Sequence, residues 1–221
     1  MKDFELKEYD TEDLEDTLKR IENSFGINFE ENELAFVTNF GQLSDSIINK
    51  IKAENKGDCT SQQAFYKLRE VIKVELGIEN IIPKTELSKV LAKGQRIKNL
   101  KKIEENLGFK LNIIGPPDYI VGSFFILLVG SLIGLFFDWF LPLIGIAISI
   151  IGFEISNNIG TELKYKTVKQ VVEKMRRENY SKSRRHPNTG NRKEIEKTII
   201  DIFATDFDLD KSKLTRDTQL I

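Results

Sequence analysis

The hydroxyl of Thr11 is the side chain best placed for chemistry near the start of the chain. Apolar residues recur after it at helical spacing: Leu14, Leu18, Ile21 and Phe25. A hydroxyl at a helix start can cap the free amides of the first turn, or it can carry a group whose phosphate the helix dipole stabilises. Because the methyl group of threonine crowds its oxygen, we expect Thr11 or Asp10 to act as a cap.

The residue types that most catalytic or metal sites need are scarce. His186 is the only histidine and Cys59 the only cysteine, so the sequence offers neither a zinc-ligand cluster nor a cysteine–histidine pair. It contains no glycine-rich phosphate-binding motif. Cys59 is interpreted as a half-buried structural thiol, with a reactive thiol at a helix start as the alternative. We therefore expect no catalytic residues, no metal site and no enzymatic activity.

Acidic residues cover one face of the same N-terminal helix, in a chain whose net charge is only -1. They are Glu12, Asp13, Glu15, Asp16 and Glu22. Such a run is commonly a solvated helix face, but it could also dock onto a basic surface of a partner protein. A net charge near zero supplies no general field for nucleic acid, so we expect no nucleic-acid partner.

The elements that position these residues are expected to be helices. After the helix at 11–25, a loop leads to a second amphipathic helix that starts at Phe40, and similar patterns recur along the rest of the chain. The predicted fold class is therefore all-α, with small helical modules and a two-helix hairpin. The expected segments are 1–56, 59–114, the hairpin at 118–158, then 160–180, a basic linker at 181–192, and 193–221.

An almost uncharged block occupies the middle of the chain. At ~1.5 Å per residue its first run, 119–137, covers most of a ~30 Å hydrocarbon core. The second run, 139–153, does so only if the polar residues after Glu154 reach the headgroups. Small residues would let the two helices approach closely: Gly122, Gly130, Gly134, Gly145 and Gly152. We predict a transmembrane hairpin at 118–158, with a buried hairpin of a soluble protein as the alternative.

Basic residues flank this block on both sides but are missing from the turn within it, which predicts that both termini are cytoplasmic. A lipid bilayer is thus an expected partner, and the expected location is integral to a membrane, with a bacterial inner membrane favoured. Trp139 is predicted to be an aromatic anchor at the lipid interface. The basic segment contains Arg184 and Arg185, which are predicted to contact anionic headgroups. A plain solvated linker is the alternative for this segment.

The N-terminal stretch resembles part of the acyl carrier protein family. In that family an Asp-Ser-Leu motif starts the second helix, and a Phe-Gly-like end follows fourteen residues after the serine. Here Thr11 follows Asp10 and stands fourteen residues before Phe25, with the acidic loop "FEENEL" and a further helix after it. The resemblance implies that Thr11 is the position for 4′-phosphopantetheine. Since the family's enzymes modify serine, the threonine favours a module that carries nothing.

The first helix of that module is matched at the other end of the chain. Residues 193–221 resemble the family's opening helix and the loop after it. The middle of the chain repeats the same patterns in three pairs of segments: "PKTEL" with "RDTQL", 96–111 with 17–29, and 162–179 with 34–55. The resemblance therefore implies a degenerate, circularly permuted arrangement with two modules, the second interrupted by the hairpin. In the second module Lys93 and Gly94 stand where the serine would fall.

These patterns lead us to expect a membrane-anchored, acyl-carrier-like docking or scaffold component without a catalytic role. By resemblance, its partners would be enzymes of acyl or lipid metabolism. One alternative is a working phosphopantetheine carrier tethered to the membrane. The other is a hairpin protein whose arms drive homo-oligomer assembly by sharing the split module between chains.

Overall fold

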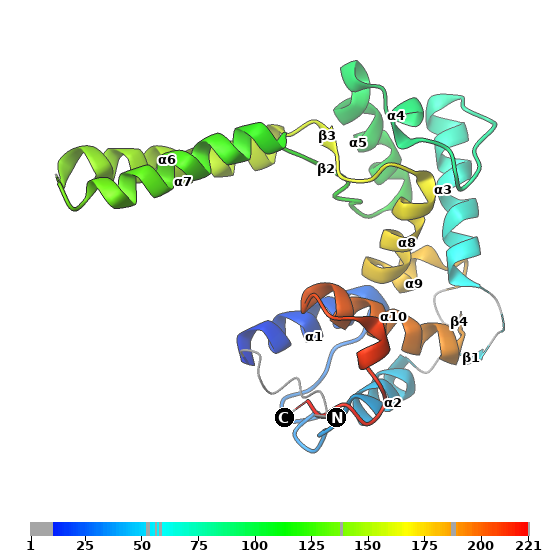
Figure 1. Cartoon of the computed structure of the whole chain (residues 1–221). Coiled ribbons are helices and arrows are strands. Elements are labelled where there is room, and N and C mark those ends of the chain that lie inside the picture. Colours follow the sequence, from blue (N-terminus) through cyan, green and yellow to red (C-terminus); the bar gives the residue numbers. More distant parts are fainter. Residues whose placement is uncertain are drawn as a thin grey trace. The chain divides into compact units, whose positions relative to one another are not determined.

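The structure, a computed structural model, describes residues 11–51, 54–55, 57, 59–137, 139–186 and 189–220 (Figure 1). It is mostly helical, which confirms the all-α class. The α-helices are α1 (Thr11–Phe25), α2 (Phe40–Ile51), α3 (Thr60–Leu76), α4 (Leu87–Val90), α5 (Arg96–Leu107), α6 (Asp118–Gly134), α7 (Phe140–Ile159), α8 (Val168–Glu178), α9 (Tyr180–Ser183) and α10 (Arg192–Asp206). The shorter elements are β1 (Glu54–Asn55), β2 (Ile114–Gly115), β3 (Glu162–Leu163), β4 (Thr189–Gly190) and the 3-10 turns η2 (Lys93–Gln95) and η3 (Lys211–Lys213).

The chain divides into two compact units. Unit 1 comprises Met1–Val71 and Val171–Ile221, and unit 2 comprises Ile72–Gln170. The division passes through α3 and α8, whereas the sequence placed its limits between helices. Strands β1 and β4 pair in parallel within unit 1, and β2 and β3 pair antiparallel within unit 2.

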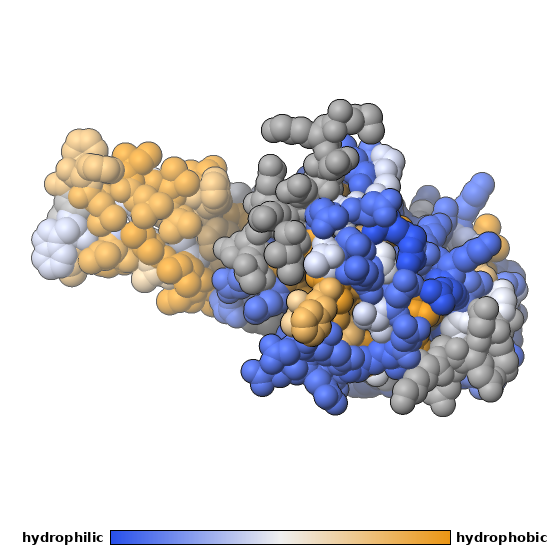
Figure 2. All heavy atoms as spheres, turned by 90° about the horizontal axis from the view of Figure 1, so that it is seen from below, coloured by the Kyte–Doolittle hydropathy of each residue, from blue (hydrophilic) through white to orange (hydrophobic). Residues whose placement is uncertain are grey.

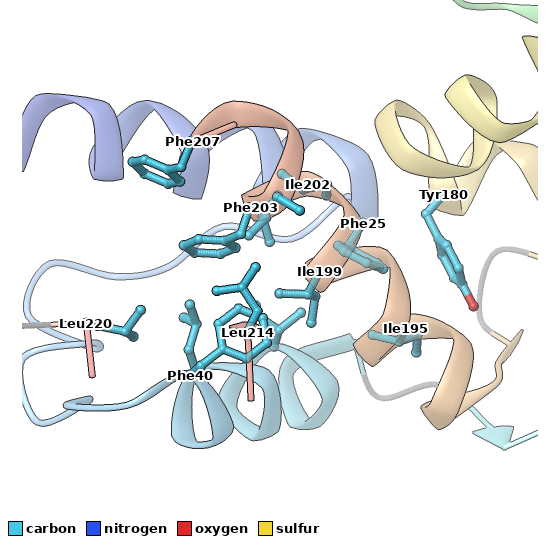
Figure 3. Close-up of a cluster of buried hydrophobic side chains, with 14 residues drawn as sticks. Phe25, Phe40, Tyr180, Ile195, Ile199, Ile202, Phe203, Phe207, Leu214 and Leu220 are labelled. Atoms are coloured by element: carbon cyan, nitrogen blue, oxygen red, sulfur yellow. The ribbon is translucent and has the colours of Figure 1, made fainter. Parts of the chain in front are cut away.

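The core of unit 1 is built by helices from opposite ends of the chain (Figure 3). Phe203 of α10 is fully buried, with its ring edge-on to Phe40 of α2 at 5.2 Å and stacked on Phe207 at 5.8 Å. Helix α1 adds Ile21 and Phe25, because apolar residues spaced three and four apart share one helix face. Burial of these large side chains is the main stabilising term of the unit.

Backbone pairing between the segment before α2 and the C-terminal segment closes unit 1. Leu220 N donates to Thr38 O at 3.0 Å, and Phe40 N donates to Thr218 O at 2.9 Å. The next amide, Gly41 N, donates to the carbonyl of Arg216 at 2.8 Å; a Cβ at Gly41 would lie 2.9 Å from that oxygen. Both halves of the split unit thus meet within one chain.

Unit 2 contains the same pairing at the positions that the sequence aligned with these. Its three hydrogen bonds are Leu87 N to Lys166 O at 2.8 Å, Val168 N to Thr85 O at 3.0 Å, and Lys169 N to Pro83 O at 2.8 Å. An isolated antiparallel bridge accompanies the pairing in each unit, joining Asn39 to Gln219 and Glu86 to Thr167. Internal similarity between the two units therefore extends from sequence to backbone geometry.

Helix α1 of unit 1 and helix α5 of unit 2, which the sequence aligns with each other, also end in the same way. In unit 1 the Glu22 carboxylate accepts a hydrogen bond from Phe29 N at 2.5 Å, and in unit 2 the Glu104 carboxylate accepts one from Leu111 N at 2.6 Å. Gly26 and Gly108 end the two helices with φ of 68° and 77°, a left-handed conformation that glycine adopts without strain.

Helices α6 and α7 form a closely packed hairpin between β2 and β3 of unit 2. A Cβ at Gly145 would lie 2.1 Å from Ser131 Oγ, and one at Gly152 would lie 2.2 Å from a ring carbon of Phe124. These two glycines therefore set the close approach that the sequence predicted. Gly122 and Gly130 have no such neighbour within 4 Å and lie outside the helix contact.

The hairpin does not have the dimensions that the sequence predicted. Helix α6 ends at Gly134 after 17 residues, about 25 Å of rise, and the apolar residues that follow it form turns. The apolar run of α7 gives way to polar residues from Glu154 onward. Among the described residues, no helix combines the length and the apolar character needed to cross a bilayer. The prediction of a transmembrane hairpin, integral to a bacterial inner membrane with cytoplasmic termini, is therefore wrong.

Replacing Phe203 with alanine should lower the free energy of unfolding by about 3–5 kcal/mol. The reason is that removal of this fully buried ring leaves a cavity where α10 packs against α2. Chemical denaturation followed by circular dichroism measures this loss. The control is Lys197→Ala on the exposed side of α10, expected to change stability by about 0.5 kcal/mol or less. Equal stability of the Phe203 variant and the control would show that α10 does not share a core with α2.

Candidate functional site

The two positions that the carrier resemblance assigns to a prosthetic group lie at equivalent places. Thr11 is the first residue of α1, eleven residues before the loop-capping Glu22; its side chain and the neighbouring Asp10 lie outside the described residues. In unit 2, Lys93 starts η2, eleven residues before the matching Glu104. Its exposed ammonium lies 3.2 Å from a carboxylate oxygen of Glu162. A lysine has no hydroxyl, so this position cannot form the phosphodiester that attaches phosphopantetheine.

The acidic residues of α1 do not all have the same environment. Glu12, Asp13, Glu15 and Asp16 are exposed in the first two turns. Glu22 is half-buried, and its carboxylate accepts the hydrogen bond from Phe29 N described above. Four of the five predicted docking residues therefore share an accessible surface, whereas Glu22 has a structural role in the loop.

Arg184 is not available to a lipid surface, so its prediction as a residue of the membrane interface is wrong. Its guanidinium is fully buried in unit 1 and donates to the hydroxyls of Thr60 at 2.5 Å and Thr189 at 3.1 Å. It also lies 3.8 Å from a carboxylate oxygen of Glu194. Burial of an arginine requires such partners, because an unpaired buried charge is strongly unfavourable. Arg185, the next residue, is exposed, and its backbone amide donates to Gln63.

The partner of Arg184, Glu194, has a structural role that the sequence did not reveal. Its carboxylate accepts hydrogen bonds from Thr60 N at 2.8 Å and Ser61 N at 3.4 Å, and so caps the start of α3. The exposed Cys59 lies beside it, with Sγ 3.7 Å from the carboxylate. Glu194 lies far from α3 in sequence, so helix-capping patterns, which are local, could not find it.

A second buried ion pair joins α8 to α10 in unit 1. Arg176 and Asp201 are both buried and form a charge-assisted hydrogen bond, and Arg176 also donates to the Thr198 hydroxyl at 2.8 Å. Burial acts to raise the pKa of Asp201, but the opposing hydrogen bonds and positive charge of Lys211 and Arg176 outweigh it and hold the pKa below its usual range. The sequence carried a signal here, because Thr198 and Asp201 fall on the apolar stripe of α10.

Trp139 lies in the turn between α6 and α7 and is 70% exposed. Its ring contacts only the neighbouring Phe140 among the ring pairs described, edge-on at 6.0 Å. The tip of the hairpin thus presents an indole to its surroundings. Across the described ranges, His, Cys, Asp and Glu side chains form no group of three with the spacing of metal ligands.

Comparison of the chain with protein-family models, with curated proteins and with solved structures found no match.

Replacing Asp201 with asparagine should destabilise unit 1 by about 3–5 kcal/mol at neutral pH, because it leaves Arg176 buried without its counter-charge. A carboxyl group with a lowered folded-state pKa contributes stability above its unfolded-state pKa of about 4, and that contribution is lost as the pH falls. The stability difference between the wild type and Asp201→Asn should therefore shrink between about pH 5 and pH 2.

Denaturation series at several pH values measure this difference. Asp208→Asn is the matched control, since Asp208 is exposed and asparagine tolerates its φ of 50°. A stability difference that stays constant down to acid pH would mean that Asp201 is not ionised in the folded chain.

Proposed function

We propose that this chain is a docking protein made of two acyl-carrier-like helical modules that carry no prosthetic group. The supporting observation is the repeated backbone frame: three hydrogen bonds, one antiparallel bridge and one glutamate-capped loop recur in both units. Shared geometry at this level favours one ancestral helical module used twice. The acyl-carrier-like character of the module rests on the sequence resemblance described above.

We infer that no prosthetic group is carried from the residues at the two positions where the carrier family attaches it. Lys93 has no hydroxyl, and Thr11 has a hindered one. A carrier module without its prosthetic group still retains the surface with which carriers meet their enzymes. We therefore place the function in protein docking rather than in acyl transfer, with enzymes of acyl or lipid metabolism as the partner class.

The docking surface is the exposed start of α1. Asp13, Glu15 and Asp16 make no ion pair with the described residues, so their charge is available to a basic partner. Opposite charges across an interface accelerate and orient association and weaken as salt screens them. A phosphopantetheinyl transferase is a suitable probe, because it must dock onto carrier modules to act on them.

Reversing two charges, Asp13→Lys with Asp16→Lys, should weaken transferase binding by about tenfold, because the partner's basic surface then meets like charge. Microscale thermophoresis at low and physiological salt measures the affinity. Glu30→Lys with Glu31→Lys is the matched control, since it makes the same charge change on the exposed loop after α1. If both double variants weakened transferase binding equally, the loss of affinity would come from net charge alone, and a docking role for α1 would be refuted.

The same transferase with coenzyme A tests the prosthetic group by intact-protein mass. The wild-type chain should remain unmodified, and Thr11→Ser should gain one phosphopantetheine, because it restores the Asp-Ser start of the family's motif. Lys93→Ser should gain none, since no acidic residue precedes it. A modified wild-type Thr11 would make the protein a working carrier, whereas an unmodified Thr11→Ser would count against the resemblance itself.

A further inference from the structure

The outer surface of the α6–α7 hairpin is apolar around most of its circumference. Figure 2 shows that the face of the hairpin seen from below is mostly apolar. On α6, Phe125, Ile126 and Leu127 are consecutive and all exposed, although consecutive side chains on a helix point about 100° apart. Ile150 and Ile151 are likewise both exposed on α7. Exposed apolar surface of this extent marks an interaction site rather than ordinary scatter of hydrophobic residues.

The contact between the two helices is already complete. Ser131 and Ser149 are buried on the inner side of the hairpin, where Gly145 and Gly152 allow close packing. Phe124 and Phe153 close the same side with their ring centres 6.0 Å apart. The exposed residues thus do not belong to an unfinished helix pair, and they need a covering of another kind.

The geometry of the exposed residues distinguishes between possible coverings. A second copy or a globular partner contacts a hairpin from one side and leaves side chains on the other side in water. Liquid hydrocarbon surrounds an inserted element from every direction, and it matches a surface without a polar face. The exposed charge of α7, Glu154, lies in the half of the helix nearer the base of the hairpin. The charges near the hairpin fit this arrangement, because exposed lysines flank its base: Lys110 before β2, and Lys164 and Lys166 after β3.

We propose that the α6–α7 hairpin binds a lipid surface, with its apolar length inserted in the hydrocarbon and its base at the headgroups. The chain enters and leaves the lipid on the same side, at the base of the hairpin, because β2 and β3 pair there. Tyr119, exposed at the start of α6, and the three lysines meet the headgroup layer, where aromatic and basic side chains are favoured. The proposal uses none of the residues proposed for docking, so its test is independent of the test of the docking function.

Trp139 reports directly on insertion, because it is the only tryptophan of the chain and lies in the hairpin turn. The full-length protein is mixed with vesicles of phosphatidylcholine and phosphatidylglycerol. Its emission should shift to the blue, and lipids brominated along their acyl chains should quench it. An unshifted, unquenched spectrum, with a discrete dimer by sedimentation, would show that a second copy covers the hairpin and would overturn the proposal.

Charge on the outer surface provides the second test. Ile126→Lys with Ile148→Lys should weaken partitioning into the vesicles at least tenfold, because both side chains are exposed on the hairpin. Val74→Lys with Ile82→Lys is the matched control, placing two lysines at exposed apolar positions outside it. Circular dichroism checks that both variants remain helical. Equal partitioning of the two variants would assign lipid binding to another part of the chain, and the quenching result on the wild type does not depend on either variant.

Discussion

Closure of unit 1 by the two ends of the chain is the constraint on which the rest of the structure depends. Helix α10 supplies Phe203 to a core that also takes Ile21 and Phe25 from α1 and Phe40 from α2, and Phe207 adds to it just after α10 ends. The hydrogen bonds from Leu220 to Thr38 and from Phe40 to Thr218 then fix the register of the two segments. Such contacts join residues that are distant in sequence, so forming them costs the conformational entropy of closing a long loop. The core between α2 and α10 must therefore supply most of the compensating free energy.

Unit 2 repeats the backbone pairing that closes unit 1, and this similarity explains where the α6–α7 hairpin can be inserted. The alignment of the two units places β2 and β3 at the loop that follows α1 in unit 1, where the chain is exposed and Lys50 pairs with Glu33. Surface loops accept long insertions when the inserted segment begins and ends close together. The antiparallel pairing of Ile114 with Leu163 meets this condition, and Gly160 allows the returning chain to pass against Gly115, where a Cβ would lie 2.1 Å from the backbone.

Sequence reasoning was successful where structure is encoded locally. The period of apolar residues placed α1 at 11–25 and the start of α2 at Phe40, and the structure has both. It was less successful for single side chains, because burial depends on partners from distant segments. Arg184 looked like part of an exposed basic run, yet Thr60, Thr189 and Glu194 enclose it. The length of an apolar run likewise overestimated the length of α6, since the helix ends before the run does.

The two surfaces that remain exposed after folding obey different physics. The acidic start of α1 is hydrated, and its interactions act over about 10 Å and weaken with salt. The apolar side chains of the hairpin gain free energy only when water is removed from them, so their part of the interaction is of short range and insensitive to salt. Charge changes on α1 should therefore alter protein docking without altering lipid contact, and substitutions of the exposed apolar residues of the hairpin should do the reverse. The two proposed contacts therefore depend on different forces and on different residues, and a change made in one surface should leave the other unaffected.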